Sequence, residues 1–179
     1  MAQKDYRAER QDYKTPASIY KPLLHLLDIE TFHIDVCCSE CNIPSYFHYI
    51  DGKTNGLIAN WHGYCFMNPP FKYTKLWIKK AVEESSNNGA VVVSVIPADR
   101  LETQYYQKYV LSNPNCLFAF LPDKQGFIIP GQESEEIKPS QKIMIAIFTS
   151  YKSEIEIIKD LWHIKEPFNT PIFRGGGVR

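Results

Sequence analysis

The sequence predicts an α/β fold with a largely parallel sheet, packed as one compact domain. Strand-like and helix-like segments alternate along the chain, as they do where helices cover the faces of a sheet. Residues 90–96 form a continuous apolar run rich in β-branched side chains, which is typical of a strand buried on both faces. The length of 179 residues suits one domain. We place it at residues 15–165, between a flexible polar arm (1–14) and a C-terminal tail (166–179).

The composition narrows the class of protein. Hydrophobic residues make up 44% and aromatic residues 13%, which excludes disorder as the default state. The 20 Lys and Arg balance the 20 Asp and Glu, which argues against a protein that coats nucleic acid by charge alone, but not against a local basic patch. No apolar run approaches the roughly 20 residues of a membrane span, and the N-terminus has no signal core. We therefore expect a cytoplasmic protein with reduced thiols and no membrane partner.

The individual elements follow from caps and periodicity. Thr15 is expected as the N-cap of a helix with Pro16 at its first position, because apolar residues at helical spacing follow. In a second helix, at 74–86, Leu76 is expected to face inward and Lys80 outward. Further strands are expected at 32–36, 45–50, 64–67, 90–96, 116–121 and 142–148, further helices at 101–111 and 153–163, and a frayed segment from residue 173.

Two loops at the carboxyl ends of strands form the candidate site, since ligands of parallel sheets bind there. One loop contains Asp35, and the other is Asn68-Pro69-Pro70-Phe71 after the strand at 64–67. The Asn68 side-chain oxygen and the Pro69 carbonyl are two hydrogen-bond acceptors on a loop that the prolines stiffen, and Phe71 adds a flat apolar face. This set suits a planar substrate with an exocyclic amine. Acceptors that take both amine hydrogens favour a pyramidal nitrogen whose lone pair faces an electrophile.

An ordered set of motifs extends this interpretation over residues 12–149. With these motifs the chain resembles the phage-type, Dam-like DNA N6-adenine methyltransferases. The motifs, in order, are Asp12-x-x-Thr15-Pro16, Ile34-Asp35-Val36-Cys37-Cys38-Ser39, Asn42, Tyr46-Phe47, Asp51-Gly52, Leu57, Trp61, Asn68-Pro69-Pro70-Phe71, Trp77, Lys80-Ala81, Pro97-Ala98-Asp99 and Pro139-Ser140.

The resemblance implies a Rossmann-like methyltransferase that uses S-adenosylmethionine to methylate N6 of an adenine flipped out of DNA. Phage or prophage DNA modified in this way is protected from host restriction. The resemblance implies that Asn68 and the Pro69 carbonyl hold the amine while Phe71 stacks on the base, with no metal involved. The implied cofactor residues are Thr15, Pro16, Asp35 (near the methionine end), Cys37, Cys38, Asn42, Tyr46, Asp51 (at the ribose) and Asn68. The candidate DNA contacts are Lys72, Lys75, Asp99 and Arg100.

The sequence also departs from the family pattern. Cys37-Cys38 stands where many methyltransferases have a glycine-rich turn, and Phe71 replaces the commoner Tyr. Only 32 residues separate Asp35 from Asn68, so one crossover between parallel strands is expected to be reduced. The polar segment 122–139 matches the pattern poorly, and we interpret it as a hairpin or mobile loop near the DNA.

Three alternatives stay open at the level of the sequence. Loops of this kind also occur in enzymes that methylate guanine N2 in RNA or glutamine side chains in proteins. A catalytically inactive DNA-binding relative is a further alternative. The cysteines and histidines at 33–65 raise the question of a zinc site, but they lack paired CxxC spacing. The oligomeric state, monomer or weak dimer, does not follow from the sequence.

Overall fold

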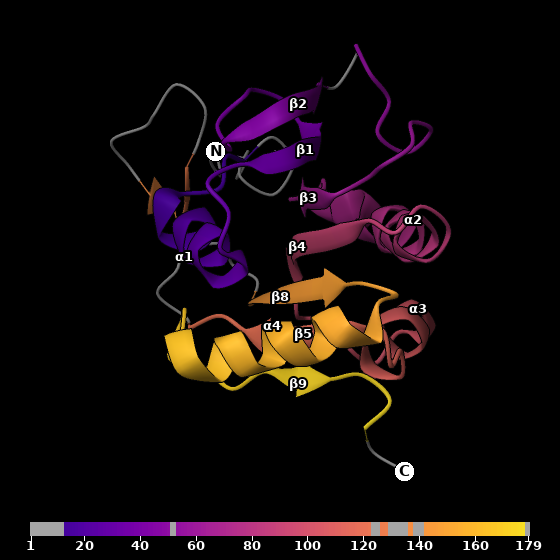
Figure 1. The fold of residues 1–179 in the computed structure, drawn as a ribbon. Helices are drawn as coiled ribbons and strands as arrows, with labels where there is room; N and C mark the ends of the chain where they lie inside the picture. Colours follow the sequence, from indigo (N-terminus) through magenta and orange to yellow (C-terminus); the bar gives the residue numbers. More distant parts are fainter. Residues whose placement is uncertain (1–12, 51–52, 123–125, 129–135, 138–141, 178–179) are drawn as a thin grey trace, which may run out of the picture.

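A computed structural model describes residues 13–50, 53–122, 126–128, 136–137 and 142–177. The described residues form a seven-stranded sheet in the order β2-β1-β3-β4-β8-β5-β9 and a two-stranded antiparallel sheet of β6 and β7 (Figure 1). The structure confirms the α/β class. The strands are β1 (Phe32–Cys38), β2 (Ser45–Ile50), β3 (Tyr64–Met67), β4 (Val91–Pro97), β5 (Cys116–Phe120), β6 (Phe127–Ile128), β7 (Glu136–Ile137), β8 (Ile143–Phe148) and β9 (Phe173–Arg174).

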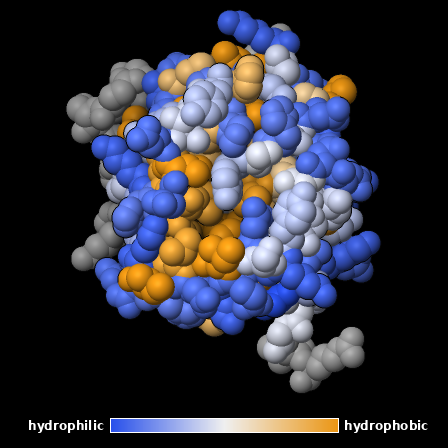
Figure 2. All heavy atoms as spheres, in the orientation of Figure 1, coloured by the Kyte–Doolittle hydropathy of each residue, from blue (hydrophilic) through white to orange (hydrophobic). Residues whose placement is uncertain are grey.

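Helices pack on both faces of the large sheet. On one face α1 (Ala17–Leu27) and α4 (Lys152–Lys165) cover a core that includes Phe32 and Phe66. On the other face α2 (Thr74–Asn87), α3 (Gln104–Tyr106) and the π-helical segment η3 (Gln107–Leu111) cover a second core. Figure 2 shows the first face, where hydrophobic side chains gather beside α1 and hydrophilic residues surround them. Every residue of β4 and β8 is buried, as the apolar run at 90–96 predicted.

The strand directions differ from the prediction of a largely parallel sheet. The strands β2, β1, β3 and β4 run parallel to one another. The strand β8 is antiparallel to both β4 and β5, and β9 is antiparallel to β5. The sheet is therefore mixed, and the prediction holds only for its first four strands. A strand buried on both faces has the same continuous apolar sequence whichever way it runs, so the sequence of β8 did not reveal its direction.

The connections around β1 are short. Residues 39–44 alone lead from β1 to the parallel β2, and residues 51–63 lead from β2 to β3, with no helix in the described part of either connection. The sequence predicted one reduced crossover at this place. The chain moves from β1 to one side of the sheet for β2 and then to the other side for β3. Such a reversal marks the point where α/β sheets bind ligands, at the carboxyl ends of the strands.

Several local details correct the sequence prediction. The helix α1 begins at Ala17, so Pro16 rather than Thr15 occupies the N-cap position, and among the described residues no side-chain cap hydrogen bond is formed there. The strand β1 continues to Cys38, beyond the predicted end at residue 36, so Cys37 and Cys38 lie in the strand rather than in a loop after it. In α2, Leu76 is 52% exposed and Lys80 forms an ion pair with the buried Glu84, the reverse of what periodicity suggested.

The C-terminal segment also differs from expectation. Phe173 and Arg174 form β9 at the edge of the sheet, where a frayed segment was expected, and Phe173 stacks on Phe118 of β5. The segment 122–139, for which a hairpin or a mobile loop was expected, contains the antiparallel pair β6 and β7, in agreement with the first alternative. Of the proposed N-terminal arm, residues 1–12 lie outside the described residues. Within the described part of the chain, no helix has the length and apolar character needed to cross a membrane.

Candidate active site

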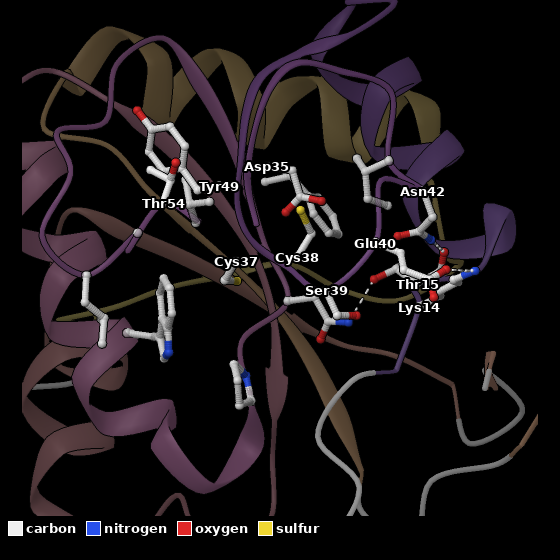
Figure 3. A pocket seen from close by; sticks show the side chains of 18 of the residues that line it. Lys14, Thr15, Asp35, Cys37, Cys38, Ser39, Glu40, Asn42, Tyr49 and Thr54 are labelled. Carbon is white, nitrogen blue, oxygen red and sulfur yellow. Dashed lines mark hydrogen bonds and ion pairs between the residues drawn. The ribbon is translucent and has the colours of Figure 1, made fainter. Parts of the chain in front are cut away.

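A cavity of about 730 Å³ opens at the carboxyl ends of β1 and β3 (Figure 3). At this place β2 and β3 lie on opposite sides of β1 in the sheet. Its volume is in the range of small-molecule and cofactor sites. Figure 3 shows Asp35 and Cys38 toward its middle, with Thr15 and Asn42 on one side and Tyr49 on the other. The walls come from segment 13–15, the end of β1 with residues 39–43, the segment 53–57, the catalytic-loop candidate at 68–70 and the start of α2.

The cavity brings together most of the cofactor residues that the resemblance implied. Two others lie elsewhere: Pro16 does not line the cavity, and Tyr46 is 70% exposed on the edge strand β2 with its ring against His33. Asp51 lies outside the described residues. The implied residues that line the cavity are Thr15, Asp35, Cys37, Cys38, Asn42 and Asn68.

Asp35 is a buried carboxyl group within the cavity wall. It lies on β1 with 2% of its surface exposed, and the residue paired with it on the neighbouring strand β3 is Phe66. Burial raises the pKa of Asp35 to about 7, although hydrogen bonds from the Cys37 backbone and the Cys38 side chain favour the charged form. A positive charge beside Asp35 would favour its charged form and lower this pKa. A positively charged ligand group would stabilise the buried carboxylate and so offset the free-energy cost of removing it from water.

The two cysteines beside Asp35 are neutral thiols. Burial, followed by the negative charge of Asp35, raises the pKa of Cys38 to about 12 and also raises the pKa of Cys37. Because only a thiolate is a good nucleophile, neither side chain is suited to covalent chemistry near neutral pH. The cysteines therefore shape the cavity and, in the case of Cys38, donate to Asp35.

Asn68 follows β3 and is fixed by its amide nitrogen. Its Nδ2 donates to the backbone carbonyl of Tyr13 at 3.2 Å and to the Thr15 hydroxyl at 3.0 Å. Both amide hydrogens are thereby used inside the protein. The side-chain oxygen remains as the acceptor that Asn68 can present to a ligand, which is the role the sequence predicted for it.

The rest of the proline-containing loop supports this arrangement. Pro69 is buried and Pro70 lines the cavity, while Phe71 begins the short 3-10 helix η2 (Phe71–Tyr73). The Phe71 ring meets the ring of Phe127 edge to face, with centroids 6.1 Å apart and planes at 87°. Phe127 belongs to β6 and also contacts Tyr13, with ring centroids 6.3 Å apart, so the smaller sheet touches the loop through aromatic packing.

One cavity wall was not expected from the sequence. The segment 53–57 approaches β1 so closely that a Cβ on Gly56 would lie 2.0 Å from the Val36 carbonyl oxygen. Trp61 fixes this segment by donating from its indole nitrogen to the Gly56 carbonyl and by stacking on Trp77. The lone glycine between Asn55 and Leu57 was the available signal, but its meaning depends on β1 lying beside it. The lining residues missed in this wall are Tyr49, Thr54, Asn55, Gly56, Leu57 and Trp77.

Glu84 of α2 holds the same wall in place through Trp61. It is 5% exposed and accepts hydrogen bonds from the Trp61 backbone N–H at 2.8 Å and from the Asn88 amide at 2.5 Å, in addition to its ion pair with Lys80. These donors lower the pKa of Glu84 despite its desolvation. The charged network therefore has a structural role, holding Trp61 against α2.

The four candidate DNA contacts lie outside the cavity but at the same edge of the sheet. Lys72 and Lys75 are exposed directly after the proline-containing loop, in η2 and α2. Asp99 and Arg100 are exposed just beyond β4, which runs parallel to β3. Among the residues that the structure describes, no group of three or more His, Cys, Asp and Glu side chains is placed to hold a metal ion.

Comparison with known proteins identifies the family of the chain. The family model of DNA N-6-adenine-methyltransferases (Dam) matches residues 3–166. The chain belongs to the Dam family of DNA N-6-adenine-methyltransferases. Over 94 residues it is 27% identical to the DNA N-6-adenine-methyltransferase of Haemophilus phage HP1 (strain HP1c1). That alignment covers 52% of this chain and 53% of the relative, so the match spans about half the length of each Dam protein.

Proposed function

We propose that this Dam-family protein transfers a methyl group from S-adenosylmethionine to N6 of an adenine flipped out of DNA. The observation that carries the proposal is the arrangement of Asn68. Its amide nitrogen is bound to Tyr13 and Thr15, and its oxygen is left to accept at the cavity that contains Asp35. Family membership favours adenine in DNA over guanine in RNA or glutamine in protein.

The cavity residues fit S-adenosylmethionine by charge and by size. When bound, this cofactor supplies an electrophilic methyl group on a positively charged sulfur. Asp35 would hold one of its cationic groups, since a buried carboxylate with a raised pKa gains most from a positive partner. Tyr49, Leu57 and Trp77 would form an apolar wall for its planar part. The mixed sheet, with its ligand cavity at the reversal around β1, supports a Rossmann-like arrangement.

The acceptors of the proline-containing loop would activate the amine. The lone pair of an exocyclic amine is delocalised into the ring, which makes it a poor nucleophile. Asn68 Oδ1 and the Pro69 carbonyl would each accept one amine hydrogen and so favour the pyramidal form that reacts. Hydrogen bonds that strengthen in this way toward the transition state accelerate the reaction itself. No base on the protein is required, because the proton can leave to water after transfer.

The base must leave the helix to reach this loop, since the amine is inaccessible inside a duplex. Phe71 would stack on the flipped base, with its own ring held by Phe127. Lys72 and Lys75 would contact phosphates beside it, and Asp99 and Arg100 would face the DNA from the end of β4. In a phage or prophage, the resulting methylation would protect the DNA from restriction.

The test is direct. DNA from a methylation-deficient bacterial host that expresses the protein is expected to acquire N6-methyladenine, as read by single-molecule sequencing or mass spectrometry of nucleosides. The purified protein is expected to transfer tritium from methyl-labelled S-adenosylmethionine to unmethylated DNA. Absence of label in DNA of varied sequence, in single-stranded and double-stranded form, would refute the proposal. Label in RNA or protein instead would select one of the alternatives.

A further inference from the structure

We propose that Thr15 is a positioning residue that holds the Asn68 amide in the one orientation able to accept from the target amine. This inference rests on the proposed function, because it gives Asn68 Oδ1 that acceptor role. The hydroxyl of Thr15 lies 3.0 Å from Asn68 Nδ2, and the residue is only 2% exposed.

The chemistry of the two partners decides which way the amide faces. The Tyr13 carbonyl can only accept, and it lies 3.2 Å from Asn68 Nδ2. If the amide turned over, Asn68 Oδ1 would face this carbonyl, and two acceptors would repel each other. A hydroxyl can donate or accept, so Thr15 accepts the second hydrogen once Tyr13 has set the orientation. Together the two partners use both amide hydrogens and direct Oδ1 away from themselves.

Thr15 is itself held in place from neighbouring segments. Asn42 Nδ2 donates to the Thr15 carbonyl at 2.9 Å, and Lys14 pairs with Glu40 at 2.5 Å. The backbone of Lys14 forms two further hydrogen bonds with Ile128 of β6, at 2.9 and 3.0 Å. Segment 13–15 is therefore fixed against the connection after β1 and against the smaller sheet. These contacts set the position of the Thr15 hydroxyl before any ligand binds.

The ordinary structural role for this threonine does not apply. A Thr-Pro pair before a helix normally supplies an N-cap, in which the hydroxyl accepts from the first turn. In α1 the N-cap position belongs to Pro16, and within the described part of the chain no side-chain cap bond is formed. The Thr15 hydroxyl instead serves Asn68, 53 residues away in the chain. Removing it should therefore leave the start of α1 intact.

The experiment compares Thr15→Val with Thr15→Ser in the full chain. Valine has nearly the same shape but no acceptor, so kcat is expected to fall on the order of 10- to 100-fold, as for other misplaced catalytic groups. The KM for S-adenosylmethionine should change little, and serine should restore kcat. Thr170→Val is the matched control, because the Thr170 hydroxyl is buried without a hydrogen-bond partner among the described residues.

A second readout does not depend on activity. The side-chain amide resonances of Asn68, assigned in ¹⁵N spectra by their loss in Asn68→Asp, should shift in Thr15→Val and stay in place in Thr15→Ser. Unchanged kcat and unchanged resonances in Thr15→Val would overturn the proposal. A raised KM for the cofactor with unchanged kcat would also overturn it, because Thr15 would then contact the cofactor directly.

Two further outcomes are separable. If Thr15→Val fails to fold, as judged by circular dichroism, Thr15→Cys takes its place, since sulfur is only a weak acceptor. If the unmodified protein transfers no methyl group, the proposed function fails, and the Asn68 resonances alone decide whether Thr15 orients the amide.

Discussion

The two halves of the sheet use buried polar groups differently. In the parallel half, β2-β1-β3-β4, the Asp35 carboxyl group within β1 and the Asn68 amide just after β3 lie around a cavity. In the antiparallel half, β8-β5-β9, the strand β8 is apolar and fully buried beneath the helix α4. In the parallel half, the described residues of the two connections that flank β2 form no helix, whereas α4 packs over the strands of the other half. The ligand cavity thus lies where regular helix cover is missing.

The largest expected effect is the loss of methyl transfer in Asn68→Ala. Removing a positioned acceptor from the reacting amine should lower kcat by at least about 100-fold. The protein should still unfold cooperatively, at a lower midpoint, because the Tyr13 carbonyl and the Thr15 hydroxyl lose their donor. Transfer of tritium to DNA measures the loss. Asn113→Ala is the matched change in the other half. It removes the bond that Asn113 donates to the Tyr109 carbonyl and the bond that it accepts from the Asn115 N–H, and it should leave activity intact. Activity retained in Asn68→Ala would contradict this division of roles between the two halves.

Asp35→Asn is expected to lower the affinity for S-adenosylmethionine by roughly tenfold or more, because a buried charge partner is lost. The same change should stabilise the empty protein at high pH. Burial raises the pKa of Asp35 to about 7 in the folded state, from an ordinary value of 3.8. The folded state therefore binds this proton more tightly than the unfolded state does. The free energy of unfolding then falls as the pH rises from about 4 to 7 and is level above that.

Thermal unfolding of both proteins at pH 5 and pH 8 measures how much of the pH dependence of stability comes from Asp35. At pH 8 the unfolding midpoint of Asp35→Asn should exceed that of the original by several degrees, at about 2 to 4 °C per kcal/mol for a chain of this size. At pH 5 the difference should be smaller. Asp160→Asn, an exposed change on α4, should shift neither midpoint. Equal differences at both pH values would contradict a raised pKa for Asp35.

Two glycines offer a matched pair, one in each half. A Cβ on Gly56 would lie 2.0 Å from the Val36 carbonyl oxygen, and one on Gly175 would lie 2.2 Å from the Asn113 carbonyl oxygen. Each change to alanine should destabilise the fold by roughly 1–3 kcal/mol through overpacking. Only Gly56→Ala should also weaken cofactor binding, measured by calorimetry, because only Gly56 lines the cavity. Equal cofactor affinities in Gly56→Ala and Gly175→Ala would contradict this expectation, because they would show that the cavity wall can move to fit the added methyl group without loss of binding.

The smallest expected effect concerns the lysines beside the proline-containing loop. Replacing Lys72 or Lys75 by Gln should weaken DNA binding about equally for all sequences. It should reduce the slope of log affinity against log salt by about 1 for each phosphate that the protein no longer neutralises. Fluorescence anisotropy over a salt series measures that slope. Lys159→Gln on α4 is the comparison, and a slope unchanged in all three variants would place the DNA elsewhere.

Much of the parallel half could be predicted from the sequence. The strands at 45–50 and 64–67 have the predicted bounds, because turns and prolines delimit short apolar runs there. Asp35, Asn42 and Asn68 were expected to share a site, and the cavity brings them together. The expectation for Asn68 follows from the rule that the carboxyl ends of neighbouring parallel strands lie at one edge, whereas Asn42 was expected there only from the family resemblance.

What could not be predicted depends on contacts between distant segments. The direction of β8 is set by its partners β4 and β5, and nothing within residues 143–148 encodes it. The two-residue strand β9 is too short for alternation to identify. The wall around Gly56 has meaning only beside Val36, and the role of the Thr15 hydroxyl only beside Asn68. Periodicity reflects only the spacing of residues within one segment, so it does not reveal contacts between residues of distant segments.

The order of strands in the sheet also limits when the protein can finish folding. The strand β8 lies between β4 and β5 although it follows both in the sequence, and α4 packs against α1. Lys165 near the end of α4 donates to the His25 carbonyl, 140 residues earlier. During synthesis the first four strands of the sheet thus leave the ribosome with the apolar edge of β4 uncovered. We expect a nascent chain stopped before residue 143 to be protease-sensitive and dependent on chaperones.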